Sequence, residues 1–184
     1  MLNANRYKYL VDYVSTNFCT NILEIGTNRG FTAKELLLAS INKDINYFGI
    51  DLFEDITPEI FKKESSIETW PRDMVKEELK SLRIGKIKLY KGFSKSVLPT
   101  ISLIGKIDMI FIDGGHSFDT IITDIMYSLN LIKPGGVIFI DDYSDELPDV
   151  KKAVDELYCK LKKEILEEHT DTYRGYLYRM VRLS

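Results

Sequence analysis

The strongest constraint in this sequence is the alternation of short apolar runs with segments of helical periodicity. Five runs have the length of buried strands: Asn21–Gly26, Asn46–Asp51, Lys86–Tyr90, Ile107–Asp113 and Gly136–Asp141. Between the last two, Ile121, Ile122, Ile125 and Leu129 recur at helical spacing, and the Lys-Pro-Gly-Gly stretch that follows is expected to end that helix. This alternation predicts βαβ units and an α/β fold with a parallel sheet between two helical layers.

The chain is expected to form one domain over residues 1–184, with three additions to the sheet. Asn3–Asn17 predicts a helix, so we interpret residues 1–20 as a helical cover over the ligand crevice. Residues 52–83 form a long connection, which predicts either a lid or substrate wall, or a helix packed onto the sheet through Trp70 and Phe61. Two strand-like runs near residues 163–169 and 175–182 predict a closing hairpin.

Composition and charge argue against several classes of protein. With 45% hydrophobic residues the chain is globular, and with a net charge of −3 and no basic tract it lacks the features of a nucleic-acid-binding protein. Cys19 and Cys159 form no C-x-x-C motif and are expected to be free thiols. The N-terminus is too polar for a signal peptide, and the apolar runs are too short to cross a membrane. We therefore expect a cytoplasmic protein without a membrane or nucleic-acid partner; a homo-oligomer is left open.

The loop after the first strand, Glu24–Phe31, suits ligand binding at the carboxyl edge of the sheet. Gly26 and Gly30 allow a tight turn and close approach of a ligand to the backbone before a helix begins. The dinucleotide motif G-x-G-x-x-G is absent, because Asn28 occupies its middle glycine position. Asp51 ends the second strand, where an acid can accept hydrogen bonds from ribose hydroxyls. The alternative is an ordinary strand-to-helix turn and an ordinary turn aspartate.

Three carboxylates end the fourth and fifth strands. Asp113 follows one strand, and Asp141 with Asp142 ends the other. If these strands are neighbours, about 4.8 Å apart, the three acids meet at one edge and repel unless a cation neutralises them. Hard oxygen ligands suit Mg²⁺. The alternative is that these aspartates only cap turns.

Two histidines and one tyrosine complete the candidates. His116 follows Asp113 closely and could orient cofactor or substrate, assist a metal, act as a base, or simply bond backbone at a helix start. His169 is interpreted as structural, and Tyr143 as a loop residue that could reach substrate.

The sequences EIGTNRG and KPGGVIFIDD, with an acid closing the second strand, resemble the class I S-adenosylmethionine-dependent methyltransferases. The stretch Phe111–Tyr143, FIDGGHSFDTIITDIMYSLNLIKPGGVIFIDDY, is similar to the O-methyltransferase subgroup with the macrocin-type sugar enzymes and, more distantly, catechol O-methyltransferase. The resemblance covers about Ile22 to Tyr143. It implies a Rossmann-like, doubly wound sheet of seven strands, mostly parallel, with an antiparallel last strand and helices on both faces.

The resemblance also implies roles for particular residues. It places a cofactor loop at Glu24, Gly26, Thr27, Asn28 and Gly30, the ribose acid at Asp51, adenine contacts at Gly92, Phe93 and Ser94, and a metal site at Asp113, Asp141 and Asp142. Asp113 is expected to serve the cofactor as well, and Asp113 and His116 are the expected catalytic residues. For the adenine segment, a plain loop ending in a serine helix cap is the alternative.

We therefore expect transfer of a methyl group from S-adenosylmethionine to a hydroxyl oxygen of a small or sugar-like acceptor, assisted by Mg²⁺. The macrocin-type enzymes carry larger additions around the core, so their substrate class transfers poorly. Two alternatives are a nicotinamide-dependent oxidoreductase and a non-catalytic subunit that keeps the cofactor fold.

Overall fold

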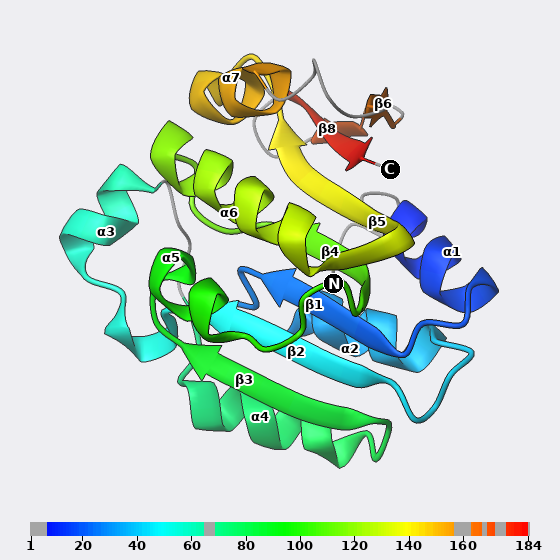
Figure 1. The fold of residues 1–184 in the computed structure, drawn as a ribbon. Helices are drawn as coiled ribbons and strands as arrows, with labels where there is room; N and C mark the ends of the chain where they lie inside the picture. Colours follow the sequence, from blue (N-terminus) through cyan, green and yellow to red (C-terminus); the bar gives the residue numbers. More distant parts are fainter. Residues whose placement is uncertain (1–6, 65–68, 157–162, 167–168, 172–175, 184) are drawn as a thin grey trace.

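A computed structural model describes residues 7–64, 69–156, 163–166, 169–171 and 176–183 (Figure 1). Its sheet has the strand order β3-β2-β1-β4-β5-β8-β6, with β7 paired to β8 outside this path. The strands are β1 Asn21–Ile25, β2 Asn46–Asp51, β3 Lys86–Lys91, β4 Ile107–Ile112, β5 Ile132–Tyr143, β6 Lys163–Ile165, β7 His169–Asp171 and β8 Tyr176–Leu183. Cys159 lies outside the described residues, and Cys19 is a buried free thiol.

The five predicted strands form the parallel part of the sheet, and β8 is antiparallel to both β5 and β6. The expected fold class is therefore confirmed, including the antiparallel last strand and the closing hairpin, with β7 as a short extra strand. The boundaries of most strands differ by one or two residues from those expected, and the largest difference is that β5 begins at Ile132 rather than at Gly136. The helix before it, Phe118–Leu131, therefore ends before Lys133–Gly136, and these four residues already belong to β5.

Alternate residues of the central strands enter two separate hydrophobic cores, as the two-residue period of a strand requires. On β4, Met109 and Phe111 pack against one helical layer, whereas Ile110 and Ile112 pack against the other. All six side chains of β4 are buried, which explains the uninterrupted apolar run Met109–Ile112 within it. The edge strand β3 instead carries exposed lysines, which protect a free strand edge from pairing with another chain.

The two helical layers lie on opposite faces of the sheet (Figure 1). One layer contains α1 Lys8–Thr16, α2 Phe31–Ala39 and α4 Arg72–Ser81, and the other contains α6 Phe118–Leu131 and α7 Pro148–Glu156. The predicted N-terminal helix is thus present as α1, and Leu10 and Val14 are its buried residues. No helix in the described part of the chain is both long and apolar enough to cross a membrane.

The long connection after β2 contains three short elements: η1 Phe53–Asp55, α3 Pro58–Lys63 and then α4. Trp70 packs edge-to-face on Phe31, with ring centroids 5.6 Å apart, so it fastens the connection to α2. The expectation that Phe61 packs a helix onto the sheet is wrong: its side chain is exposed, and α3 buries none of its residues. The apolar residues of α3 are too few to form a core-facing stripe.

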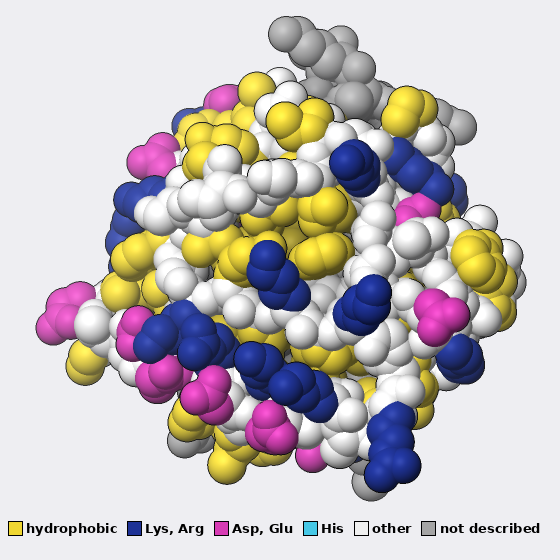
Figure 2. Space-filling model, turned by 60° about the horizontal axis from the view of Figure 1, so that its bottom comes forward, with side chains coloured by type: hydrophobic (Ala, Val, Ile, Leu, Met, Phe, Trp, Pro, Cys, Tyr) yellow, Lys and Arg dark blue, Asp and Glu magenta, His cyan; other side chains and the backbone are white. Residues whose placement is uncertain are grey.

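The charged surface shows no segregation by sign on the face turned forward in Figure 2, where Lys and Arg side chains lie among Asp and Glu side chains. Ion pairs such as Lys91 with Glu54 and Lys34 with Glu78 also bring opposite charges together on the described surface. This face therefore offers no continuous basic surface to a phosphate backbone.

Candidate active site at the carboxyl edge of the sheet

The glycine loop between β1 and α2 lies directly against the end of β4. Gly26 has a φ of +97°, and a Cβ atom at this position would lie 1.9 Å from the carbonyl oxygen of Asp113. Only glycine therefore allows this approach. The loop turns again at Asn28 and Gly30, with φ values of +49° and +74°, before α2 begins. Its backbone is thereby folded at the edge of the sheet where ligands bind in open α/β folds.

Asp51 connects the loops that follow β1 and β2. Its Oδ2 accepts a hydrogen bond of 2.8 Å from the Asn28 amide, and its Oδ1 accepts one of 2.7 Å from the Phe53 amide. Burial raises the pKa of the Asp51 carboxyl, while the amides of Phe53 and Asn28 act in the opposite direction. The Leu52 amide also acts on this carboxyl. A carboxylate has about four acceptor positions, so at least one remains for a hydroxyl group of a ligand. The role of Asp51 as the ribose acid stays a prediction.

Glu24 lies beneath the glycine loop rather than beside it. Its side chain is 1% exposed and accepts a hydrogen bond from the Tyr47 hydroxyl, which also lies 3.4 Å from Thr27 Oγ1. Burial raises the pKa of Glu24 to about 8, although the hydrogen bond from Tyr47 partly offsets this effect. Glu24 therefore supports the loop from below, and a direct contact with cofactor stays a prediction.

The segment after β3 closes the same edge. Gly92 has a φ of +140°, and its amide donates to the carbonyl of Asp51 at 2.9 Å. The short helix α5 runs from Ser94 to Val97 and has Phe93, not a serine, as its N-cap. The alternative of a serine cap is therefore wrong. Gly92 thus lies next to the end of β2, and the adenine contacts of Gly92, Phe93 and Ser94 stay a prediction.

The three aspartates predicted as metal ligands come together. Asp113, Asp141 and Asp142 each offer a carboxylate oxygen, and these oxygens lie within 4.8 Å of one another. Neighbouring strands cause this, because β4 pairs with β5 in the register Ile112 to Ile140. Asp142 has a φ of +61°, and its amide donates to Asp141 Oδ1 at 2.8 Å. Carboxylate oxygens from three acids, two of them buried, form a donor set that fits Mg²⁺.

His116 belongs to this cluster. Its Nε2 lies 2.9 Å from Asp142 Oδ2, and its Nδ1 is buried with no hydrogen-bond partner among the described residues. Burial lowers the pKa of the imidazole, but Asp142, Asp141 and Glu64 outweigh this effect, so the pKa is raised overall. The alternative in which His116 bonds backbone at a helix start is wrong. Its observed partner is a predicted metal ligand.

Three residues near this edge were missed by the sequence analysis as site residues. The Tyr7 hydroxyl lies 3.5 Å from Asp113 Oδ2, and Glu64 accepts hydrogen bonds of 2.9 Å from the amide and hydroxyl of Ser117. Asp124 of α6 is fully buried, and its carboxyl lies near Gly114. No short motif marks them, because Tyr7 and Glu64 meet partners far away in the sequence. Only the expected helix over Asn3–Asn17, which includes Tyr7, gave a partial signal.

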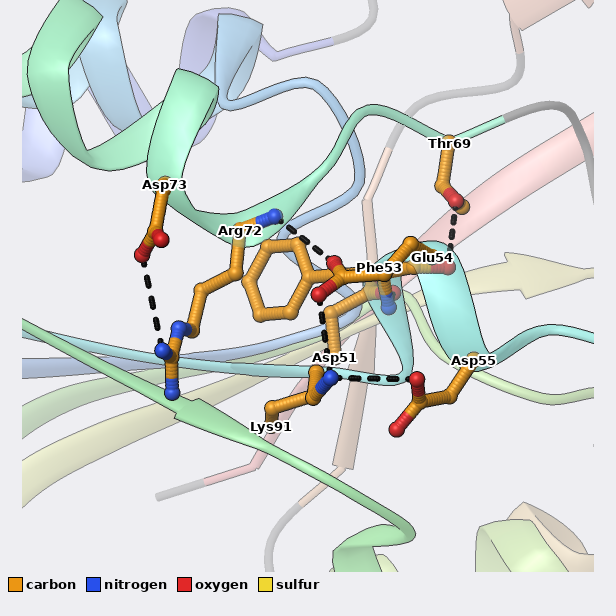
Figure 3. A network of polar contacts seen from close by, with 8 residues as sticks. All are labelled: Asp51, Phe53, Glu54, Asp55, Thr69, Arg72, Asp73 and Lys91. Carbon is orange, nitrogen blue, oxygen red and sulfur yellow. Dashed lines mark hydrogen bonds and ion pairs between the residues drawn. The ribbon is translucent and has the colours of Figure 1, made fainter.

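A polar network fixes the start and end of the connection after β2 (Figure 3). The Glu54 carboxylate accepts hydrogen bonds of 2.9 Å from Lys91 Nζ and from the Arg72 amide, and Thr69 Oγ1 donates to the Phe53 carbonyl at 2.7 Å. The Arg72 amide, with smaller contributions including Lys91, lowers the pKa of Glu54 to about 2. Because Glu64 also accepts hydrogen bonds from Ser117, the N-cap of α6, the connection is anchored at a second point.

Comparisons with known proteins agree with this geometry. A family model described as a methyltransferase domain matches residues 23–143. The uncharacterized protein R132 of Acanthamoeba polyphaga mimivirus is 30% identical over 144 residues, which are 76% of this chain and 60% of R132. The chain thus spans about 60% of the length of that relative.

Solved structures show the same fold at low identity. The O-methyltransferase TomG from Streptomyces achromogenes, in complex with SAM, has a TM-score of 0.75 and 19% identity over 100% of this chain and 81% of its own. An O-methyltransferase from Bacillus cereus in complex with SAH has a TM-score of 0.74 and 17% identity, covering 96% and 79%. The N-methyltransferase NodS from Bradyrhizobium japonicum has a TM-score of 0.66 and 15% identity, covering 96% and 92%.

Proposed function

Because the chain belongs to the methyltransferase domain family, we propose that it transfers a methyl group from S-adenosylmethionine to a hydroxyl oxygen of a small molecule, with help from Mg²⁺. One observation carries this proposal. The glycine loop and the acid cluster are in direct contact, because the Cα of Gly26 packs on the carbonyl of Asp113. A cofactor on the loop would therefore present its methyl group beside the acids.

The cofactor part of the proposal assigns one task to each loop. The turns at Gly26 and Gly30 leave the backbone close to the ligand, Asp51 accepts from the ribose hydroxyls, and the Gly92–Ser94 segment borders the base. The relatives TomG and the Bacillus cereus enzyme, solved with SAM and SAH, support this choice of cofactor. A nicotinamide dinucleotide is disfavoured because Asn28 replaces the middle glycine of its motif.

The acid cluster favours oxygen as the methyl acceptor. A divalent cation held by Asp113, Asp141 and Asp142 would bind the acceptor oxygen and lower its pKa. The chain itself must align acceptor and methyl group for in-line displacement and keep the carboxylates in place. His116 holds Asp142, and either His116 or an aspartate of the cluster receives the acceptor proton. A non-catalytic subunit would need neither the glycine loop nor this cluster.

The substrate is proposed as a hydroxylated metabolite or sugar-like molecule. The Phe111–Tyr143 stretch resembles the macrocin-type sugar enzymes, so a sugar-like acceptor stays within the proposal, although it is not singled out by this resemblance. The N-methyltransferase NodS shares the fold, so the fold alone does not choose oxygen over nitrogen. The choice of oxygen depends on the three carboxylates.

Two measurements test the proposal in sequence. Calorimetry should show binding of S-adenosylhomocysteine and none of NAD⁺. A mass-spectrometric screen of hydroxylated metabolites with S-adenosylmethionine should then show a mass gain of one methylene. EDTA should abolish turnover and Mg²⁺ should restore it. Asp141→Asn should lower turnover by several orders of magnitude and leave S-adenosylhomocysteine binding unchanged, since the cation serves the acceptor. Turnover that resists both EDTA and Asp141→Asn would contradict the metal assignment.

A further inference from the structure

We propose that Tyr7 is a positioning residue of the acid cluster, whose hydroxyl holds the Asp113 carboxylate in the orientation that binds a divalent cation. The inference rests on the proposed function, because it concerns the metal site assigned there. It adds a residue from the first helix of the described chain to a site otherwise built at the ends of β4 and β5.

The Tyr7 side chain is fixed by its packing on the sheet. Its ring meets the Phe111 ring edge-to-face, with centroids 5.9 Å apart and an interplanar angle of 84°. Phe111 lies on β4 two positions before Asp113, so the Tyr7 hydroxyl reaches the carboxyl end of that strand. Behind the ring, α1 is anchored by Leu10 and Val14, which are fully buried. Tyr7 is the N-cap of α1, so its phenol is held at the start of a packed helix.

The chemistry of a phenol suits this task. The Tyr7 hydroxyl is directed at Asp113 Oδ2 at 3.5 Å, a weaker contact than an O–H···O hydrogen bond of about 2.5–3.0 Å. A neutral donor restrains the carboxylate without neutralising it, and the remaining lone pairs stay available to a cation. Partners that orient a metal-binding carboxylate commonly change metal affinity by about 10- to 100-fold.

Tyr7 completes a pattern across the cluster. Asp142 is paired with His116 at 2.9 Å, and Asp141 Oδ1 accepts from the Asp142 amide at 2.8 Å. With Tyr7 on Asp113, each of the three carboxylates has a hydrogen-bonding group that limits its rotation. Three restrained carboxylates lose less conformational entropy on binding a cation than three mobile ones.

The same helix supplies a matched control. Tyr13 also packs edge-to-face on a phenylalanine of the sheet, Phe139 of β5, with centroids 5.8 Å apart. The charged groups around the Tyr13 hydroxyl are Cys19, Lys133, Arg182 and Asp108, none of which belongs to the cluster. Tyr13→Phe therefore removes one hydroxyl from α1 in an equivalent packing environment and leaves the acids untouched.

The experiment compares the wild type, Tyr7→Phe and Tyr13→Phe with Mn²⁺ as the probe. Calorimetric titration with Mn²⁺, without acceptor, should show about tenfold weaker binding for Tyr7→Phe and wild-type binding for Tyr13→Phe. All three proteins should bind S-adenosylhomocysteine equally and unfold at similar temperatures. This selective loss distinguishes positioning of a metal ligand from a general effect on the fold.

Three results would overturn the inference. The first is Mn²⁺ affinity within twofold of the wild type in Tyr7→Phe. The second is an equal loss of Mn²⁺ and S-adenosylhomocysteine affinity in that variant, which would indicate a structural role. The third is a wild-type protein that binds S-adenosylhomocysteine but not Mn²⁺, which would remove the metal site while leaving the cofactor part of the proposed function intact.

Discussion

Asp124 should make the protein less stable as the pH rises, and Asp124→Asn should remove this effect. The side chain is fully buried on α6, and neither carboxyl oxygen has a hydrogen-bond partner with good geometry among the described residues. Burial raises the pKa of Asp124 to about 7; the nearby Ser94 hydroxyl partly offsets this effect, and the charge of Glu64 adds to it. The folded protein therefore keeps this proton at pH values where the unfolded chain has lost it.

The sign and size follow from this difference in pKa. Below about pH 4 the carboxyl is protonated in both the folded and the unfolded state, so its ionisation does not change the free energy of unfolding. Between pH 4 and pH 7 the unfolded chain releases the proton first, and the free energy of unfolding falls by about 1.4 kcal/mol per pH unit. Above pH 7 the decrease in the free energy of unfolding reaches its full size, about 4 kcal/mol for a pKa raised from 3.8 to about 7. Asparagine has the size of the neutral acid and does not titrate.

Urea denaturation of wild type and Asp124→Asn between pH 5 and pH 8.5 tests this reasoning. The advantage of the variant should grow by about 2.5 kcal/mol from pH 5 to pH 7 and then stay constant. Ser128→Ala is the matched control, because Ser128 is a buried, unpartnered hydroxyl one turn further along α6 and does not titrate. Its effect should be the same at every pH. A difference between wild type and Asp124→Asn that does not change with pH would refute the argument.

Two further substitutions test the loops around the site. Gly26→Ala should lower the free energy of unfolding, measured by urea denaturation, by about 2 kcal/mol more than Gly105→Ala does. Both glycines have a positive φ, but of these two only Gly26 would place a Cβ atom against the backbone of another segment. Equal losses of stability in the two variants would contradict the close approach of Gly26 to Asp113. Glu54→Gln should lower the melting temperature at pH 7. The difference from the wild type should shrink as the pH falls from 4.5 towards 2, because the pKa of Glu54 is lowered to about 2 in the folded state. A difference unchanged by pH would mean that the Glu54 charge does not stabilise the connection.

The strands and the acid cluster could be predicted from local sequence because both depend on short-range rules. A doubly buried strand needs a continuous apolar run, and Met109–Ile112 within β4 is one. Asp113 and Asp141 then follow strands that are neighbours in the sheet, so their convergence requires only that β4 pairs with β5. The glycine loop could also be predicted from the sequence, because glycines at a strand-to-helix turn indicate a backbone conformation that other residues rarely adopt.

The partners of these residues could not be predicted in the same way. Glu64 reaches Ser117 from a connection whose path depends on anchors at Lys91 and Arg72. Glu24 was expected to touch the cofactor, yet its orientation depends on Tyr47 of the neighbouring strand. Such contacts join segments that are brought together only by the folded sheet, and no periodicity in the sequence encodes them.

The buried acids at this end of the protein differ in their surroundings. Glu24 and Asp124 have raised pKa values because burial disfavours their charge, and a neutral carboxyl is a poor ligand for a cation. Asp141 and Asp142 are also buried, and the Asp142 amide and His116 supply polar partners at 2.8 and 2.9 Å. Their carboxylate oxygens lie within 4.8 Å of one another and of an Asp113 oxygen, a cluster to which neither Glu24 nor Asp124 belongs. Burial alone therefore does not identify the ligands of the proposed metal; the convergence of the three carboxylates does.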